Sequence, residues 1–142
     1  MLRVENIEVR YNRVPAIHDV SFTVDRGELI SIVGANGSGK TTLLKTVAGT
    51  LHPTKGRMEF EGTDISDTSQ VDIVRMGITY VPEDRLIFGP LTVAENLKLG
   101  AYTLNDPQAV EKNMEYVYSL FPILKKRWKS YGSVRARPVA GA

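Results

Sequence analysis

A nine-residue run in the first third of this 142-residue chain constrains its fold more than any other segment. It reads Gly34, Ala35, Asn36, Gly37, Ser38, Gly39, Lys40, Thr41 and Thr42, which matches the pattern G-x-x-x-x-G-K-[ST]. Glycines let the backbone curl without Cβ clashes, so the N–H groups of residues 37–42 point inward toward an anion. Because the apolar segment 29–33 precedes the run and helix-forming residues follow it, we expect a strand, a phosphate-binding loop (P-loop) and a helix rather than a chance glycine-rich turn.

The side chains of this loop indicate that its ligand is a nucleoside triphosphate with Mg²⁺. Lys40 would supply a mobile cation between the β- and γ-phosphates. The Thr41 hydroxyl is placed to ligate Mg²⁺, and Thr42 is placed to reach the α-phosphate. The predicted nucleotide-binding residues of the loop are Gly34, Asn36, Gly37, Ser38, Gly39, Lys40, Thr41 and Thr42.

Composition agrees with a soluble intracellular globular protein, because 42% of the residues are hydrophobic, 24% are charged and none is cysteine. The formal net charge of +2, although unevenly distributed, is too small to indicate nucleic acid or anionic lipid as a partner, and we expect no nucleic acid. No apolar run reaches the roughly 20 residues that span a bilayer. Any role at a membrane is therefore expected to come through a partner protein.

Hydrophobic periodicity predicts strands on both sides of the loop. Apolar and polar residues alternate in segments 2–11 and 16–24, which predicts an antiparallel pair joined by a turn at 12–15. Segment 29–33 is expected to be a buried strand that leads into the loop. After the helix that begins at about Gly39, the predictions are a C-cap at Gly49, a strand at 57–60 with a turn at 61–64, a helix at 70–76 capped by Ser69, and a second buried strand at 78–81.

The rest of the chain is expected to be helical. Thr92 and Glu95 fit a capping box, and Asp106 followed by Pro107 predicts the start of a longer helix. An apolar stripe on that helix is formed by Val110, Met114, Val117 and Phe121. The stripe is expected to pack against other helices, and the alternative is a surface that binds a membrane or a partner.

Further residues occur in the same order as in a known family. Besides the P-loop they are Tyr11, 16–24, 27–28, 49–51, Pro53, Gly56, 61–62, 64–65, 80–83 and 91–97. With these residues, about positions 2–130 resemble the opening of an ATP-binding subunit of an ABC transporter. Segments 81–88 and 99–102 are most similar to one ATPase subunit of bacterial branched-chain amino-acid importers.

The resemblance implies roles for two residues outside the P-loop. Tyr11 would be the aromatic residue that stacks on adenine, since a rigid ring supplies apolar contact area, and the alternative is a plain strand-end tyrosine. Glu83 stands where most members carry the Q-loop glutamine, which contacts Mg²⁺ and the attacking water. It is therefore the candidate catalytic and metal-binding residue, and the alternative is a solvated loop acid. His18 and His52 have no second metal-type ligand at usable spacing and are assigned no role.

The sequence departs from the family pattern after Trp128. Segment 130–142 contains no Leu-Ser-Gly-Gly-Gln signature, no Walker B strand ending in Asp-Glu and no switch histidine. We therefore expect residues 1–129 to be a partial ABC-type ATP-binding domain, residues 130–142 to be an aberrant or disordered tail, and the chain alone to be incompetent in hydrolysis. Residues 122–142 hold six basic and no acidic residues, which makes a functional basic tail the alternative. A truncation or frameshift is preferred, because Arg, Ala, Gly, Pro and Val are what a shifted reading frame of a GC-rich gene tends to produce.

The expected fold class is α/β, the N-terminal part of a P-loop NTPase with an antiparallel β-subdomain and a partial helical subdomain. The resemblance implies that the chain binds and hydrolyses ATP to drive an importer of branched-chain amino acids, with ATP and Mg²⁺ as cofactors. The expected partners are membrane permease subunits and, in the intact protein, a second ATPase subunit in a nucleotide-sandwich dimer. The chain is expected to be cytoplasmic and peripheral on the inner face of the plasma membrane, held there by the permease subunits. The alternatives are a soluble ABC-type ATPase without a membrane partner and a fragment without function.

Overall fold

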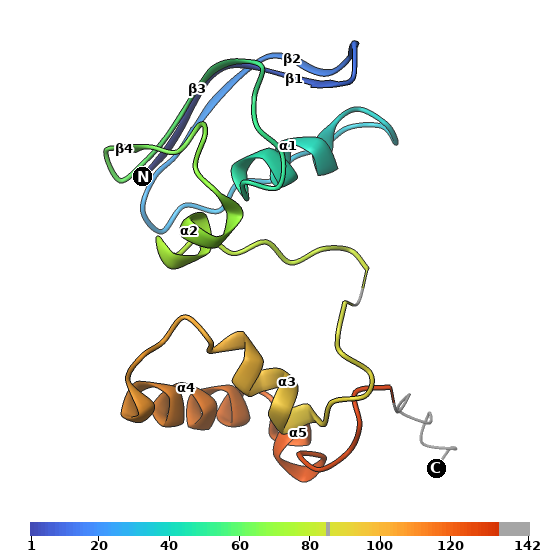
Figure 1. Ribbon diagram of the computed structural model, residues 1–142, viewed down its shortest axis with the longest axis vertical. Helices are drawn as coiled ribbons and strands as arrows, with labels where there is room; N and C mark the ends of the chain where they lie inside the picture. Colours follow the sequence, from blue (N-terminus) through green and yellow to red (C-terminus); the bar gives the residue numbers. More distant parts are fainter. Residues whose placement is uncertain (85, 134–142) are drawn as a thin grey trace. The chain divides into compact units, whose positions relative to one another are not determined.

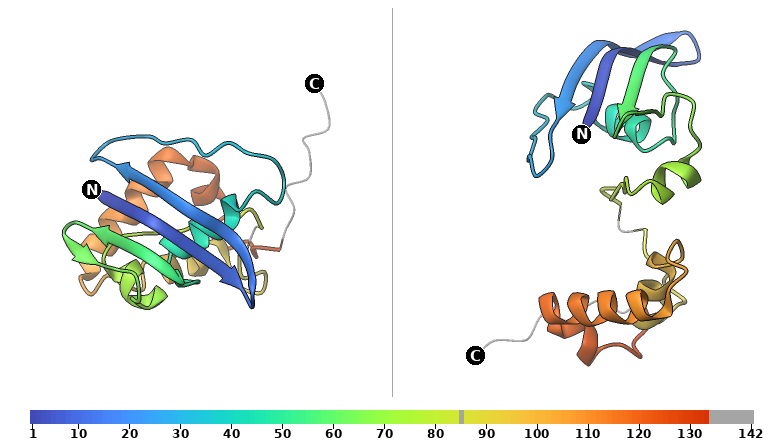
Figure 2. Two further views of the ribbon diagram at one scale, coloured as in Figure 1. Left: turned by 90° about the horizontal axis from the view of Figure 1, so that it is seen from above. Right: turned by 90° about the vertical axis from the view of Figure 1, so that its left-hand side faces the viewer.

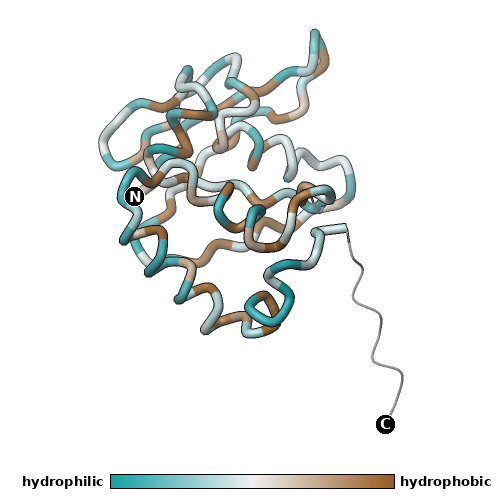
Figure 3. Tube along the Cα trace, turned by 60° about the horizontal axis from the view of Figure 1, so that its bottom comes forward, coloured by the Kyte–Doolittle hydropathy of each residue, from teal (hydrophilic) through white to brown (hydrophobic). Residues whose placement is uncertain are grey.

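The computed structural model describes residues 1–84 and 86–133 of the chain. It divides into two compact units, Met1–Val81 and Pro82–Ala142, and each is described here by itself. The first unit contains the strands with helices α1 and α2, and the second contains helices α3, α4 and α5 (Figure 1). Hydrophobic and hydrophilic residues alternate along the trace in both units (Figure 3). This alternation is what amphipathic strands and helices require.

An antiparallel sheet forms one layer of the first unit. Its strand order is β2-β1-β3-β4, with β1 at Leu2–Tyr11, β2 at Val14–Val24, β3 at Lys55–Phe60 and β4 at Thr63–Asp64. The predicted antiparallel pairing of the first two strands is confirmed, although β2 begins earlier than expected and shortens the turn. The predicted turn after β3 is also confirmed: Glu61 and Gly62 have φ of 48° and 83°, as a tight hairpin turn requires.

A register shift in β1 keeps its apolar residues on one face. A regular pleat would send Val4 to the face opposite Ile7 and Val9. The pairing with β2 shifts between Val4 and Ile7, and Asn6 in that interval has a φ of 47°. Asn6 Nδ2 donates a hydrogen bond to Asp19 Oδ1 on β2 at 2.7 Å. Because of this bulge, the apolar residues on both sides of it enter one buried cluster.

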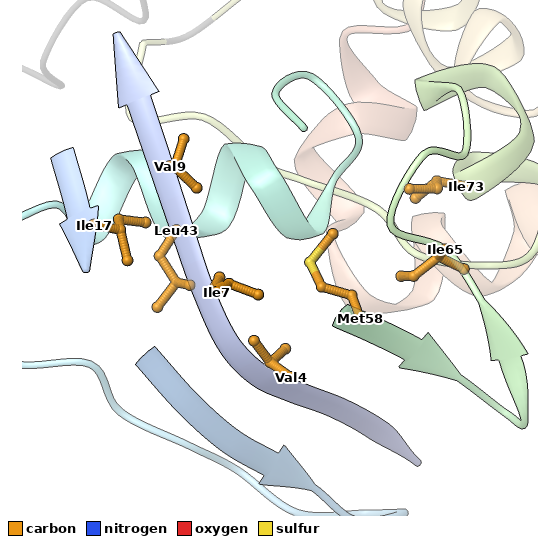
Figure 4. Packing of buried hydrophobic residues seen from close by; sticks show 8 residues of the cluster. All are labelled: Val4, Ile7, Val9, Ile17, Leu43, Met58, Ile65 and Ile73. Atoms are coloured by element: carbon orange, nitrogen blue, oxygen red, sulfur yellow. The ribbon is translucent and has the colours of Figure 1, made fainter. Parts of the chain in front are cut away.

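The hydrophobic core lies between the sheet and two helices, α1 at Lys40–Val47 and α2 at Gln70–Arg75. Helix α1 lies across one face of the sheet (Figure 2). The buried cluster consists of Val4, Ile7, Val9, Ile17, Leu43, Met58, Ile65 and Ile73 (Figure 4). Burying one such side chain is worth about 1.5–3 kcal/mol. The core therefore fixes the start of α1 relative to β1 and β2.

One buried carboxylate, Glu8, joins β1 to β3. Its side chain is 6% exposed and pairs with Arg10 Nε and with Lys55 Nζ, the latter at 3.1 Å. The hydrogen bond from Arg10, followed by the one from Lys55, holds the pKa of Glu8 below its ordinary value of 4.5. The pairing explains how a charged residue occupies a buried position of this strand.

The expected buried strands at 29–33 and 78–81 are not strands in the structure. Leu29 and Val33 are 96% and 92% exposed, and Val81 is 85% exposed. Within residues 1–84 and 86–133 the only sheet is the antiparallel one, and neither segment pairs with it. A central strand owes its stability to neighbouring strands that satisfy its backbone, so an apolar sequence without such neighbours stays extended and unpaired.

The predicted helix ends are confirmed. Gly49 follows the end of α1 with a φ of 70°, and Ser69 Oγ accepts from Asp72 N at the start of α2. Thr92 and Glu95 form the capping box of α3, which spans Val93–Gly100. Asp106 caps α4 at Pro107–Leu120, and a further short helix, α5, spans Pro122–Lys126. Sequence-local side-chain bonds of this kind satisfy the free N–H groups of a first turn.

Most of the predicted apolar stripe on α4 faces α3. Val110, Met114 and Val117 line a groove of about 270 Å³ together with Leu97, Gly100, Ala101, Leu104 and Asn113. These three residues therefore face α3 across the groove, and no residue of α4 is buried in the described structure. Phe121 differs because it follows α4 and is 56% exposed.

Residues 128–132 form backbone hydrogen bonds with residues 91–94, which lie just before α3 and in its first turn. Val93 N donates to Ser130 O at 2.9 Å, and Gly132 N donates to Leu91 O at 2.8 Å. The Asn96 side chain binds the segment just before α3. It accepts a hydrogen bond from Phe88 N at 2.9 Å and donates to the carbonyl groups of residues 88, 91 and 92. The first residues of the expected tail at 130–142 are thus held by backbone hydrogen bonds, and residues 134–142 of that expectation lie outside the described residues.

Candidate functional site

The P-loop ends at the N-terminus of α1. Gly39 is the N-cap of this helix and has a φ of 93°, in the left-handed region. Among the described residues, no side chain caps the helix start, and its first turn holds no acidic residue. The first N–H groups of a helix need partners, and the helix dipole makes this end positive. The arrangement suits an anion such as a phosphate group.

Two glycines of the loop occupy positions that a side chain would obstruct. A Cβ at Gly39 would lie 2.7 Å from Ala16 O on β2, and a Cβ at Gly34 would lie 2.5 Å from Ser38 Oγ. Glycine at these positions allows the loop to pack closely on β2 and on itself. The tight curl leaves the backbone, rather than side chains, to contact a ligand, as a phosphate cradle requires.

Lys40, the first residue of α1, turns its side chain back over the loop. Its Nζ donates to Gly34 O at 2.7 Å and to Ala35 O at 2.8 Å. The loop itself is closed by a turn in which Ser38 N donates to Ala35 O at 3.1 Å. The ammonium therefore lies against the loop backbone beside the positive end of the helix, where two positive features favour the same anion.

A cavity of about 360 Å³ lies beside the loop. A volume of this order is typical of small-molecule sites. Its lining comes from the loop and α1, from segment 29–33 and from β2, namely Ala16, Ile17, His18, Val20, Ile32, Val33, Gly34, Ser38, Gly39, Lys40 and Leu43. Sequence reasoning missed the contribution of β2, because only the packing of the sheet on α1 brings it there.

Tyr11, the last residue of β1, lies next to α1. Its hydroxyl oxygen is 3.5 Å from Thr42 Oγ1, and its side chain is about half exposed. Thr42 is buried, and its carbonyl accepts from Thr46 Oγ1 at 2.8 Å. The structure thus brings the predicted adenine-stacking residue and a predicted phosphate-binding residue together, with the ring of Tyr11 still accessible to a ligand.

The remaining predicted site residues are exposed. Asn36 lies in the loop, Thr41 lies in the first turn of α1, and Glu83 lies in the second unit. Glu83 belongs to a different unit from the P-loop, and its role at Mg²⁺ stays a prediction. In residues 1–84 and 86–133, no three His, Asp or Glu side chains gather as a metal cluster would.

A comparison with models of known protein families identifies the family to which this loop and fold belong. A family model described as "ABC transporter" matches residues 17–134, which is well over half of the chain and includes the whole P-loop. This chain belongs to the ABC transporter family. Its resemblance to that family, and its expected fold class, are therefore confirmed.

Within the ABC transporter family, the relatives include proteins of different transport systems. The high-affinity branched-chain amino acid transport ATP-binding protein BraG of Pseudomonas aeruginosa is 38% identical over 129 residues, covering 91% of this chain and 55% of that protein. The probable branched-chain amino acid transport ATP-binding protein LivF of Archaeoglobus fulgidus is 33% identical, covering 88% of this chain and 52% of that protein. The sulfate/thiosulfate import ATP-binding protein CysA of Mesorhizobium japonicum is 40% identical over 99 residues, covering 70% of this chain and 28% of that protein. The chain thus spans about half the length of the first two.

Solved structures of the family show the same fold. An ATP binding subunit of an ABC transporter is 29% identical, with a TM-score of 0.78, over 96% of this chain and 56% of that one. A dimeric ATP-binding cassette in a post-hydrolysis state, bound to ADP and Pi, has a TM-score of 0.81 at 19% identity, over 96% of this chain and 63% of that one. The second likeness shows the fold alone. No helix in the described part of our chain has the length and apolar character to cross a membrane.

Proposed function

We propose that this chain forms the ATP-binding side of a nucleotide-binding subunit that powers an ABC importer. The observation that carries the proposal is Lys40 at the N-terminus of α1, where no described side chain caps the helix, folded over a loop in which Gly34 and Gly39 leave no room for a Cβ. The nearby ring of Tyr11 supports adenine as the base. A positive, backbone-lined cradle next to an accessible aromatic ring fits the phosphates and the base of one nucleotide.

Each predicted site residue has a role in this proposal. The loop residues Gly34, Asn36, Gly37, Ser38 and Gly39 hold the phosphates through the backbone. Lys40 neutralises charge between the β- and γ-phosphates, and Thr42 reaches the α-phosphate. Thr41 and Glu83 would hold Mg²⁺, which supplies charge neutralisation on the phosphate oxygens when it is bound. A carboxylate and a hydroxyl are both oxygen ligands of the kind Mg²⁺ prefers.

Coupling to transport is proposed for the protein in its complex. Membership of the ABC transporter family supports a pair of ATP-binding subunits with nucleotide between them. Permease subunits in the membrane would be the partners that respond when the pair closes. The subunit is then peripheral on the cytoplasmic face of the plasma membrane, held there by the permease.

The proposed substrate class is branched-chain amino acids. The support is that BraG and LivF, both branched-chain amino acid transport proteins, match along about nine-tenths of the chain, whereas the sulfate importer matches over 70% of it. Segments 81–88 and 99–102, which are most similar to the branched-chain systems, favour the same substrate class. Substrate choice rests on the partners of the complex rather than on the P-loop.

Nucleotide titration of the 142-residue chain tests the site. We expect Mg-ATP and Mg-ADP to bind in calorimetry and AMP to bind far more weakly, since the loop and Lys40 hold the β-phosphate. Equal affinity for AMP and ATP would contradict the phosphate cradle.

Transport needs a separate measurement in cells. Disrupting the gene that encodes this chain should reduce uptake of labelled leucine, isoleucine and valine and leave sulfate uptake unchanged. Loss of sulfate uptake with normal leucine uptake would overturn the proposed substrate class without affecting the nucleotide site.

A further inference from the structure

The second unit carries an exposed segment of four cations and one tryptophan, which begins in the last turn of helix α5 and continues past its end. It comprises Lys125, Lys126, Arg127, Trp128 and Lys129, and we call it the basic–Trp segment. All five residues are exposed, and Trp128 keeps half of its surface accessible. Because consecutive Cα atoms are about 3.8 Å apart, the backbone of the segment spans at most roughly 15 Å. Its charges therefore act together on a partner at the surface.

The positive charge of this segment is not neutralised nearby in the sequence. No Asp or Glu occurs anywhere from position 116 to the end of the chain. None of the ion pairs formed within residues 1–84 and 86–133 includes a residue of the segment. Like charges this close together repel one another, and an anionic partner would relieve that repulsion.

Trp128 is held in place while its ring remains accessible. Its carbonyl accepts a hydrogen bond from Ala94 N in α3 at 3.0 Å. Lys129 Nζ lies 5.1 Å from the centre of its ring, within the range of a cation–π contact. The ring also lines a cavity of about 340 Å³ with Tyr118 and Lys125. An anchored indole flanked by ammonium groups presents both an apolar body and positive charge at one point.

Two apolar residues just before the segment are also exposed. Phe121 and Ile123, at the start of α5, are 56% and 53% exposed. Indole rings favour the boundary between headgroups and acyl chains, and aliphatic and phenyl side chains gain from entering the same boundary. A nucleic acid would pair with the cations and stack on the indole, but it offers no apolar phase for Ile123. This combination favours a lipid surface.

We propose that the basic–Trp segment binds the headgroups of an anionic lipid bilayer, with Trp128 at the interface. The cations attract the phosphate groups of the membrane surface, and the apolar side chains add a shallow, reversible insertion. This contact is independent of the P-loop and of any nucleotide. It gives the chain a direct attachment to the membrane, in addition to one through a partner protein.

Fluorescence of the 142-residue chain tests the proposal directly, because Trp128 is the only tryptophan in the sequence. Vesicles of phosphatidylglycerol with phosphatidylcholine should shift its emission to shorter wavelength, and brominated acyl chains should quench it. Vesicles of phosphatidylcholine alone should change neither signal. High salt should reverse the shift, since screening weakens the attraction. An equal shift with neutral vesicles would overturn the charge-based contact.

Variants locate the contact on the surface. In vesicle flotation, which separates bound protein from aggregates, Lys125→Glu with Lys126→Glu should weaken binding at least tenfold, because each cation near an anionic surface contributes about fivefold. The double variant Arg13→Glu with Lys112→Glu, at exposed positions outside the segment, is the control with the same change in net charge and should change binding less. Trp128→Ala should weaken binding several-fold.

Two outcomes would overturn the proposal. One is an effect of Arg13→Glu with Lys112→Glu as large as that of Lys125→Glu with Lys126→Glu, which would mean that net charge alone decides binding. The other is tight binding of poly-uridine without flotation on anionic vesicles, which would assign the segment to nucleic acid. Circular dichroism of each variant, compared with the unmodified chain, separates these outcomes from misfolding.

Discussion

The hydroxyl oxygen of Tyr11 lies 3.5 Å from Thr42 Oγ1, which brings the end of β1 to the helix that begins at the P-loop. The two residues are 31 positions apart. The distance exceeds the usual 2.7–2.8 Å of an O–H···O hydrogen bond, so the contact adds little energy of its own. Its importance is positional, because it places an aromatic ring beside the residues proposed to hold the phosphates.

Replacing this ring should weaken ATP binding. Tyr11→Ala is expected to cost about 1–3 kcal/mol of ATP affinity, the range for a base stacked on an aromatic side chain. Tyr11→Phe should retain most of the affinity, because it keeps the ring and loses only the long contact with Thr42. Calorimetric titration with Mg-ATP measures both. Equal losses in the two variants would assign the role to the hydroxyl rather than to stacking.

Removing the ammonium of Lys40 should abolish binding of Mg-ATP. The side chain lies against the P-loop and is the lysine of the pattern, so Lys40→Ala leaves the phosphate charge without its cation. Lys45→Ala is the control, since it removes the same charge from the same helix at a position that does not line the cavity. Direct titration decides the matter: unchanged affinity in Lys40→Ala would refute the site.

Two glycine substitutions should differ in their effect on stability. Gly39→Ala forces a φ of 93° on alanine and places its Cβ 2.7 Å from Ala16 O. Gly37→Ala forces a φ of 80° but meets nothing within 4 Å. The left-handed backbone costs about 1–2 kcal/mol in either case, and only Gly39→Ala adds the clash with β2. Urea unfolding should therefore rank Gly39→Ala as the less stable variant, and the opposite order would contradict the packing of the loop on β2.

The free energy of unfolding should decrease at acid pH, and the protonation of Glu8 should account for part of the decrease. The pKa of Glu8 is lowered in the folded state by its hydrogen bonds with Arg10 and Lys55, so its contribution is fully present above the ordinary value of 4.5. It is lost as the pH falls from that value through the lower folded pKa, because over this interval the unfolded state binds the proton more readily than the folded state. Glu8→Gln should lower the free energy of unfolding at neutral pH and flatten its decline below pH 4.5.

The free energy of unfolding of Glu8→Gln should still decline somewhat in acid, because other carboxylates also contribute. Glu61, Asp64 and Asp72 also have lowered pKa values in the first unit, through their hydrogen bonds with the chain's N-terminal amine, Ser66 and Ser69 respectively. Glu5→Gln is the control, since Glu5 is exposed on β1 and forms no ion pair within the described residues. Denaturant titrations at several pH values compare the two variants, and identical pH profiles would contradict the role of Glu8.

The 142-residue chain by itself should not hydrolyse ATP above background. Binding phosphate does not stabilise the transition state, and no residue after position 101 of the printed sequence provides an Asp-Glu pair after an apolar strand. Phosphate release by the chain is compared with that of Lys40→Ala. Robust turnover that disappears in the variant would show that the printed chain is a complete enzyme.

The sequence alone predicted features that depend on neighbouring residues. The P-loop pattern, the capping residues Ser69, Thr92 and Asp106, and the hairpin turn at 61–64 all rest on bonds formed within a few positions. Such bonds form wherever the local residues allow them, so a pattern is enough to predict them. The resemblance to the ABC transporter family rested on the same short motifs and their order.

Only the tertiary structure decided which segments pair and which residues meet. Segments 29–33 and 78–81 have the composition of buried strands, yet they remain unpaired in the described structure because a strand needs hydrogen-bonding neighbours. The bulge at Asn6, the salt bridges of Glu8 and the β2 wall of the cavity depend on the register of β1 with β2 and β3. Contacts between distant residues follow from long-range packing, which periodicity in the sequence does not specify.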